Sequence, residues 1–228
     1  MKSGRKFVGF EIANRATLMK HKILVATTNP GKMKELSQML AELAGQIEWL
    51  SLRDFPNANE VKEDGHTFAE NAAKKALGYA RQTGLWTIAD DSGLVIDAIN
   101  GLPGVFSARF AAENGIQLSR QEQDKKNNQK ILSLLKNTPQ EQRTARFVCC
   151  MCLADAQKIL TQTEGKIEGQ IIDTPMGENG FGYDPLFYVP SLGKTTAQLD
   201  SVHKNTISHR GRAVWCLKPL LKKLLVPA

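Results

Sequence analysis

The sequence predicts an α/β fold: a two-lobed single unit with a central mixed β-sheet flanked by helices and an active-site cleft between the lobes. Two observations lead to this prediction. Helical and strand-like patterns alternate along the first half of the chain, and two long strand-like segments follow them. The polar residues with possible chemistry lie on separate loops, and a cleft between lobes would bring such loops together.

The overall charge narrows the class of partner. The chain has 228 residues, a net charge of +7 and a pI of about 9.2, which suits a polyanion, either nucleic acid or a small phosphorylated substrate. An Arg-rich arm or a basic stripe studded with aromatics is missing from the sequence, so we expect a discrete anion site and no stable nucleic-acid partner. No stretch approaches the roughly 20 apolar residues of a membrane span, so we expect a soluble protein without a membrane partner.

Three of the four cysteines lie together in the apolar segment 147–153. Strand alternation would place Cys150 and Cys152 on one face and Cys149 on the other. No second Cys or His cluster completes a zinc set, so we interpret them as structural thiols of the core. With no recognisable signal peptide, this cysteine usage predicts a reducing, cytoplasmic compartment.

Residues 1–20 are basic and irregular, and they include a second methionine, Met19. We expect a poorly ordered N-terminal extension here, followed by one catalytic domain over residues 21–228. Translation starting at Met19 is an alternative, and an organellar targeting segment ranks last because the stretch is short of serine.

The first predicted strand, residues 22–26, runs into a polar turn and then a helical pattern from Met33. Pro30 suits a first helical position, and Gly31 lets a ligand approach the backbone. A helix N-terminus offers free N–H donors and a positive dipole end, so the turn suits phosphate binding. Its residues are Thr27, Thr28, Asn29, Pro30, Gly31 and Lys32. An ordinary strand-to-helix turn remains an alternative.

A short strand at residues 47–50 and a polar passage come next, and then a clear helix start. Residues 67–70 fit a capping box, so the carboxylate of Glu70 has a structural explanation. Glu63 lies in the loop before this helix, where a solvated surface acid is the alternative to a functional one. We expect at most one of the lysines at 74–75 to face a site.

The stretch around which the chain is organised is Asp90-Asp91-Ser92-Gly93. It follows an apolar strand-like run at residues 86–89, and the apolar run resumes at residues 94–96. Two acids between buried segments cannot both stay charged without a metal ion, a cation or solvent. We interpret the stretch as a reaction centre, and the alternative is a simple turn, because Asp, Ser and Gly favour turns.

The middle of the chain predicts a turn at residues 100–104 and a helix over residues 124–135 that ends before a proline. Residues 143–154 and 158–172 both have strand patterns and are separated by a short polar turn. We expect these two segments to pair as a long hairpin.

The last third contains a glycine-rich loop at residues 177–185, in which Phe181 and Tyr183 are flanked by glycines. Such a loop can present a flat ring on which a nucleobase stacks, and the alternative is a turn with core aromatics. The polar segment 204–212 precedes a final helix. Pro219 lies within that helix, so we expect a kink near residues 217–218 unless the helix ends there.

Five of these stretches together resemble the inosine triphosphate pyrophosphatase family, also called the Ham1 or non-canonical purine NTP pyrophosphatase family. They match it in order and approximate spacing, and the resemblance extends from about Lys22 to Leu225. The matching stretches are residues 27–32, 67–72, 89–93, 181–185 and 208–210.

The resemblance implies a homodimeric, Mg²⁺-dependent enzyme that hydrolyses ITP, dITP and XTP to the monophosphate and pyrophosphate. It makes Asp91 the catalytic base and a magnesium ligand, with Glu63 as the second metal-associated acid. It assigns Thr27, Thr28, Asn29, Pro30, Gly31, Lys32 and Lys75 to the phosphates, Ser92 to the reacting centre, Phe181, Gly182, Tyr183 and Asp184 to base stacking, and Lys204, His209 and Arg210 to base recognition.

These residues are chemically coherent with that reaction. Mg²⁺ prefers a few carboxylate oxygens together with waters and phosphates, and donors such as Lys204 and Arg210 favour a 6-oxo purine over adenine. The role of Asp90 beside Asp91 stays open. A pyrophosphatase for other modified nucleotides and a basic nucleic-acid-binding module remain as alternative functions.

Overall fold

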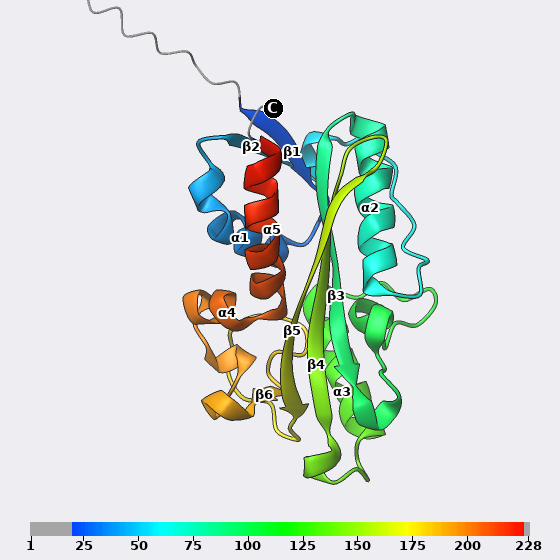
Figure 1. Cartoon of the computed structure of the whole chain (residues 1–228). Coiled ribbons are helices and arrows are strands. Elements are labelled where there is room, and N and C mark those ends of the chain that lie inside the picture. Colours follow the sequence, from blue (N-terminus) through cyan, green and yellow to red (C-terminus); the bar gives the residue numbers. More distant parts are fainter. Residues whose placement is uncertain (1–19, 226–228) are drawn as a thin grey trace, which may run out of the picture.

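The computed structural model describes residues 20–225, and the expectation for the N-terminal extension falls outside this range apart from its last residue. A seven-stranded mixed sheet runs through the molecule in the order β2-β1-β3-β4-β5-β6-β7 (Figure 1). The strands are β1 (His21–Val25), β2 (Ile47–Ser51), β3 (Trp86–Ile96), β4 (Thr144–Ala154), β5 (Ile159–Ile171), β6 (Phe187–Val189) and β7 (Lys194–Thr195). The predicted α/β class with a central mixed sheet is confirmed.

Helices cover both faces of the sheet (Figure 1). They are α1 (Pro30–Met39), α2 (Phe68–Thr83), α3 (Arg120–Leu134), α4 (Ser201–Ile207) and α5 (His209–Leu225). Helices α1 and α5 bury their apolar side chains against one face, together with Ile23 and Ile88. Further along the same face, Ile131 of α3 packs against Leu94. Helix α2 packs on the opposite face, against Ala89.

The long hairpin is confirmed, because β4 and β5 pair in antiparallel register along almost their full length. The faces predicted for the cysteines are also confirmed. Cys149 belongs to the core under α1 and α5, whereas Cys150 and Cys152 belong to the core under α2. Burial raises the pKa of the Cys152 thiol to about 12, as expected for a structural thiol.

The turn interpretation of residues 90–93 is wrong. These residues lie inside β3, which continues unbroken from Trp86 to Ile96. Strand β4 pairs with β3 over this whole stretch, including Asp90 with Met151 and Asp91 with Cys150. The ladder satisfies the backbone on that side, so polar side chains do not end the strand.

One helix boundary and one capping contact differ from the prediction. Helix α3 begins at Arg120 rather than at residue 124, because Ser119 and Glu122 form a capping box. At α2, Thr67 accepts a hydrogen bond from the N–H of Glu70 as predicted, but the Glu70 carboxylate accepts from the N–H of His66.

The final helix does not end at its proline. Pro219 lies inside α5, which runs on to Leu225, so the helix tolerates the missing donor. The polar segment 204–212 is divided between α4 and the first turn of α5. Among residues 20–225, no helix has both the length and the apolar composition needed to cross a membrane.

Candidate active site

The site forms where β1 ends and β3 continues. Strand β1 pairs with β3 only as far as Val25 opposite Ile88, so the edge of β3 beyond that point is free of a strand. A pocket of about 620 Å³ opens there, a size typical of small-ligand sites. Its lining comes from the turn after β1, the loop before α2, the start of α3, the 181–184 loop and the α4–α5 region.

Most of the residues singled out from the sequence meet in this pocket. It is lined by Thr27, Thr28, Asn29, Lys32, Glu63, Lys75, Asp91, Ser92, Phe181, Gly182, Tyr183, Asp184, Lys204, His209 and Arg210. Pro30 and Gly31 lie just behind the lining. Pro30 is the first residue of α1, as expected, and a Cβ on Gly31 would lie 3.0 Å from the Phe181 ring.

The turn after β1 is held open by its own side chains. Asn29 caps α1 by accepting a hydrogen bond from the N–H of Gly31 at 2.9 Å, and its own N–H donates to Thr27 Oγ1 at 3.2 Å. Lys32, on the first turn of α1, reaches to 2.8 Å from Asp90. The helix N-terminus and Lys32 together give this end of the pocket a positive potential.

The two adjacent acids point to opposite faces of β3, as strand alternation requires. Asp90 faces α1 and α5, is 3% exposed, and lies 3.3 Å from the Arg210 guanidinium in addition to its pair with Lys32. Burial alone would raise the pKa of Asp90, but Lys32 and Arg210 hold it well below the ordinary value. Asp90 is therefore the anion of a buried ion-pair network.

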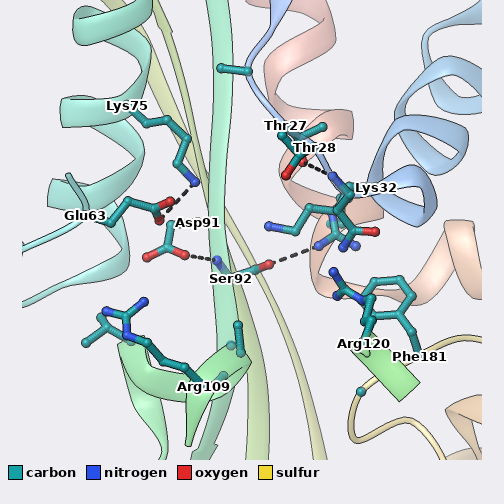
Figure 2. A pocket seen from close by; sticks show the side chains of 18 of the residues that line it. Thr27, Thr28, Lys32, Glu63, Lys75, Asp91, Ser92, Arg109, Arg120 and Phe181 are labelled. Atoms are coloured by element: carbon teal, nitrogen blue, oxygen red, sulfur yellow. Dashed lines mark hydrogen bonds and ion pairs between the residues drawn. The ribbon is translucent and has the colours of Figure 1, made fainter. Parts of the chain in front are cut away.

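Asp91 faces α2 and lines the pocket, where Figure 2 shows it beside Glu63 and below Lys75. Its carboxylate accepts from the Asn71 amide at 3.0 Å and from the N–H of Ser92 at 2.9 Å. Burial raises the pKa of Asp91 above its ordinary value, and the charge of Glu63 adds to the rise, while Asn71 and Lys75 oppose it. A carboxylate with a raised pKa is a better proton acceptor than a free aspartate.

Lys75 joins the acids at this end. Its ammonium lies 3.0 Å from Glu63 and donates to the backbone carbonyl of Asp90 at 3.0 Å, where the edge of β3 has no strand. Lys74 points away and pairs with Asp64 on the surface at 2.7 Å. The expectation that at most one of these lysines faces a site is confirmed.

The donor set at Glu63 and Asp91 fits a hard divalent cation. No cluster of three or more His, Cys, Asp or Glu side chains suited to a metal occurs in the part of the chain that the structure describes. Mg²⁺ needs fewer protein ligands, because it keeps waters and binds substrate phosphates. Glu63 and Asp91 line the same pocket and place two carboxylates there, which matches that requirement.

Cations surround an aromatic ring at the opposite end of the pocket, where Figure 2 shows Phe181 beside Arg120. The charged groups of Lys204, Arg120 and Arg210 lie 5.0, 5.3 and 5.9 Å from the centre of the Phe181 ring. Lys204 and Arg210 also pair with Glu35 of α1. The ring, with these donors, offers a stacking surface and a polar edge.

The other members of the 181–184 loop hold it in place. Tyr183 is buried and donates its hydroxyl proton to the carbonyl of Ser107 at 2.8 Å. Asp184 accepts from the N–H of Phe181 at 2.8 Å and from Lys204 at 2.6 Å. Gly182 donates its N–H to Asp124 at 2.9 Å. Of the two aromatic residues in this loop, Phe181 is therefore the one whose ring lies beside the three cations.

His209 lies under this end and stacks on Phe147, with 4.9 Å between ring centres. Burial lowers its pKa well below the ordinary value, and the nearby charges of Arg210 and Lys204 lower it further, so the imidazole is neutral. Its Nδ1 atom is buried without a hydrogen-bond partner among the described residues.

Sequence reasoning missed several residues of the site. Arg109, Arg120 and Asp124 line the pocket, and neither arginine forms an ion pair within residues 20–225. Surface arginines are common in loops and helix starts, so the sequence offered no signal for these two. Asn71 contacts Asp91 directly, and its place in the 67–72 motif was the available signal.

The comparisons agree with this geometry. The family model described as "Ham1 family" matches residues 23–220. The dITP/XTP pyrophosphatase of Desulforamulus reducens is 48% identical over 205 residues, covering 90% of this chain and 98% of the relative. That of Geobacter sulfurreducens is 48% identical over 197 residues, covering 86% and 94%.

Solved structures show the same fold. A HAM1 protein from Coxiella burnetii superposes with a TM-score of 0.78 at 40% identity, covering 89% of this chain and 99% of the other. The Ham1 protein of Staphylococcus aureus gives a TM-score of 0.76 at 37% identity, covering 89% and 99%. The family resemblance of the sequence is confirmed, and the chain belongs to the Ham1 family.

Proposed function

We propose that this protein hydrolyses non-canonical purine nucleoside triphosphates, namely ITP, dITP and XTP, to the monophosphate and pyrophosphate. One observation carries the proposal: a single pocket in a Ham1-family chain joins a phosphate-binding turn, a buried acid of raised pKa and an aromatic ring with cationic neighbours. The names of its relatives, dITP/XTP pyrophosphatases, support the substrate class.

In this proposal the polyphosphate lies between the turn after β1 and α2. The hydroxyls of Thr27 and Thr28, the cap at Asn29 and the ammonium of Lys32 bind phosphate oxygens, while Pro30 and Gly31 shape the turn. Lys75 holds the same charge from the opposite side of β3, as Figure 2 illustrates. Such clamps orient the α-phosphorus for attack and stabilise the leaving pyrophosphate.

Asp91 accepts the proton of the attacking water. Its raised pKa makes it basic enough for this task, and the hydrogen bonds from Asn71 and Ser92 fix its orientation. Glu63 and Asp91 would hold Mg²⁺, and the bound ion would supply charge neutralisation on the polyphosphate. Ser92 connects this reaction centre to Arg210, because the Ser92 hydroxyl accepts a hydrogen bond from the Arg210 guanidinium at 3.0 Å.

The purine stacks on Phe181, and its 6-oxo group accepts hydrogen bonds from the cationic end of the pocket. Lys204 and Arg210 supply donors there, with His209 beneath them and Gly182, Tyr183 and Asp184 holding the loop. Adenine would present an amino group to these donors and leave them unpaired, so ATP and dATP are poor substrates.

The proposal also covers the domain organisation, oligomeric state and location of the protein. We expect residues 21–228 to act as one catalytic domain, in a homodimer. We also expect a cytoplasmic location, which the free thiols of buried Cys149, Cys150 and Cys152 support.

A substrate panel tests the proposal. Purified protein with Mg²⁺ is given dITP, ITP, XTP, dATP, dGTP and modified pyrimidine triphosphates, and pyrophosphate and orthophosphate are measured separately. The proposal predicts pyrophosphate from the first three and little from the others, with loss of release when the metal is chelated. Orthophosphate as the sole phosphorus product would contradict it, and a preference for pyrimidines would reassign the substrate.

A further inference from the structure

The segment before α2 runs along that helix in the opposite direction. Residues later in the segment contact residues earlier in α2. We call residues 59–66, which lie along α2, the strap. The contacts join Asn59 to Gln82 at 2.7 and 3.1 Å, Val61 to Gly78, Glu63 to Lys75 at 3.0 Å, Gly65 to Asn71 at 2.8 Å and His66 to Glu70 at 2.8 Å.

Asn71 differs from the other strap contacts because it also touches the reaction centre. Its side chain is 1% exposed, its Nδ2 donates to Asp91 Oδ2 at 3.0 Å, and its Oδ1 accepts from the N–H of Gly65 at 2.8 Å. The partners fix the amide orientation, since a carboxylate only accepts and a backbone N–H only donates. Both polar ends of Asn71 are therefore used.

The backbone of the strap approaches Asn71 as closely as a glycine allows. A Cβ on Gly65 would lie 2.7 Å from Asn71 Oδ1, closer than real Cβ contacts. Lys75 follows Asn71 by one helical turn, so both project from the same side of α2. Asn71 and Lys75, one turn apart on α2, thus bind the strap at Gly65 and at Glu63.

The two oxygens of Asp91 are held by different parts of the molecule. Oδ1 accepts from the N–H of Ser92, the next residue in the same strand. Oδ2 accepts from Asn71, so Asn71 is the group that links the carboxylate to the strap. Figure 2 shows the outcome, with Glu63 and Asp91 facing the same space.

We propose that Asn71 is a positioning residue whose amide fixes the Asp91 carboxylate relative to the strap that carries Glu63. The inference rests on the proposed function in taking these two acids as the reacting pair. Ligands held by such hydrogen bonds commonly lose about 10-fold to 100-fold in metal affinity or activity when the partner is removed.

Three variants test the role. Asn71→Ala removes both hydrogen bonds. Asn71→Asp keeps an acceptor for Gly65 but replaces the donor to Asp91 with a like charge. Gln82→Ala is the matched control, because it removes the strap's contact with Asn59 at the far end of α2 and leaves Asp91 untouched. Urea unfolding of each variant identifies the conditions under which it is fully folded.

Two measurements are made on folded protein. For dITP hydrolysis, both Asn71 variants are expected to lose about 10-fold to 100-fold in kcat with KM changed less than about 3-fold, whereas Gln82→Ala keeps the wild-type kcat. For Mn²⁺ titrated without nucleotide and followed by electron paramagnetic resonance, Asn71→Ala is expected to bind about 10-fold more weakly than wild type.

A folded Asn71→Asp variant with wild-type kcat would overturn the inference, and so would an Asn71→Ala variant with wild-type kcat and Mn²⁺ affinity. A loss of stability alone, with both values unchanged, would mean that Asn71 serves only the fold. Failure of wild type to release pyrophosphate would count against the proposed function instead, and the Mn²⁺ titration would still test Asn71.

Discussion

The two faces of β3 treat neighbouring acids in opposite ways. On the face under α1 and α5, Asp90 is surrounded by the cationic groups of Lys32 and Arg210, and its pKa is lowered. On the face under α2, burial raises the pKa of Asp91 and the charge of Glu63 adds to the rise, although Asn71 and Lys75 oppose it. A fully compensated buried charge belongs to the scaffold, whereas an incompletely compensated one is ready to exchange a proton or bind a cation.

The same contrast separates the two ends of the pocket. At the aromatic end, Lys204 and Arg210 form ion pairs with Glu35, Asp90 and Asp184. At the acid end, the strap, Lys75 and Asn71 hold the two carboxylates in a shared space. The end of the pocket proposed to recognise the base is therefore made of residues held in ion pairs. The end proposed to react contains acids whose charges are only partly balanced by cations.

The largest effect on stability should come from a change at Asp90, on the face under α1 and α5. Asp90→Asn leaves Lys32 and Arg210 buried without that carboxylate, so the free energy of unfolding should fall by about 3 to 5 kcal/mol. Urea unfolding measures it. Asp64→Asn is the control, since Asp64 pairs with exposed lysines on the surface, and it should lower the free energy of unfolding far less than Asp90→Asn does. Equal stability of the two variants would refute the scaffold role.

Phe181→Leu tests the aromatic end. Loss of a stacking ring costs about 1 to 3 kcal/mol per base, so the dissociation constant of dITP should rise about 5-fold to 150-fold. Binding is measured calorimetrically with Ca²⁺ in place of Mg²⁺. Phe110→Leu is the control, because the Phe110 ring also carries a cation, Lys130 at 4.4 Å, but lies outside the pocket. Unchanged binding by Phe181→Leu would remove the ring from base recognition.

The adjacent lysines of α2 give a matched pair at the acid end. Lys75→Ala removes a charged donor from the pocket and should lower kcat/KM for dITP by about 10-fold to 100-fold, the value of a charge-assisted hydrogen bond. Lys74→Ala removes a surface pair and should change it less than about 2-fold. Steady-state kinetics measure kcat/KM for both variants. Similar losses in the two would show that the positive charge matters and that its position in the pocket does not.

The pH dependence of stability should have opposite signs on the two faces. Because the pKa of Asp90 is lowered on folding, the unfolded state binds more protons and Asp90 adds stability above its ordinary pKa of 3.8, which is lost as pH falls. Because the pKa of Asp91 is raised, its contribution is present below 3.8 and lost as pH rises through the folded value.

Relative to wild type, Asp90→Asn should therefore become less stable, and Asp91→Asn more stable, as pH rises from about 3 to 7. Each unit of pKa shift corresponds to about 1.4 kcal/mol of stability. Urea midpoints measured in a chelator give both slopes. Slopes of the same sign would contradict the division between the acids.

Much of the fold could be predicted from local pattern. Apolar runs identified β1 and the β4–β5 hairpin, and Asn29-Pro30 marked the start of α1. The strand through Asp90 and Asp91 could not, because its polar residues favour a turn unless a partner strand pairs with them. That partner, β4, lies about sixty residues later in the chain.

The site was predictable where chemistry-bearing residues fell within motifs, and less so where packing decided their role. Tyr183 shares its motif with Phe181, yet its hydroxyl is tied to Ser107 in the core and the Phe181 ring lies among the cations. Arg109 and Arg120 come from a short 3₁₀ segment and a helix start whose positions depend on the whole fold. No local pattern reports such distant contacts.

The most direct test of Asp91 as the catalytic base is the turnover of Asp91→Asn, measured as pyrophosphate release from dITP with Mg²⁺ at neutral pH. We expect a loss of about 100-fold to 10,000-fold in kcat, as for removal of a general base, in a protein that unfolds at no lower urea concentration than wild type. A folded Asp91→Asn variant with wild-type turnover would contradict it.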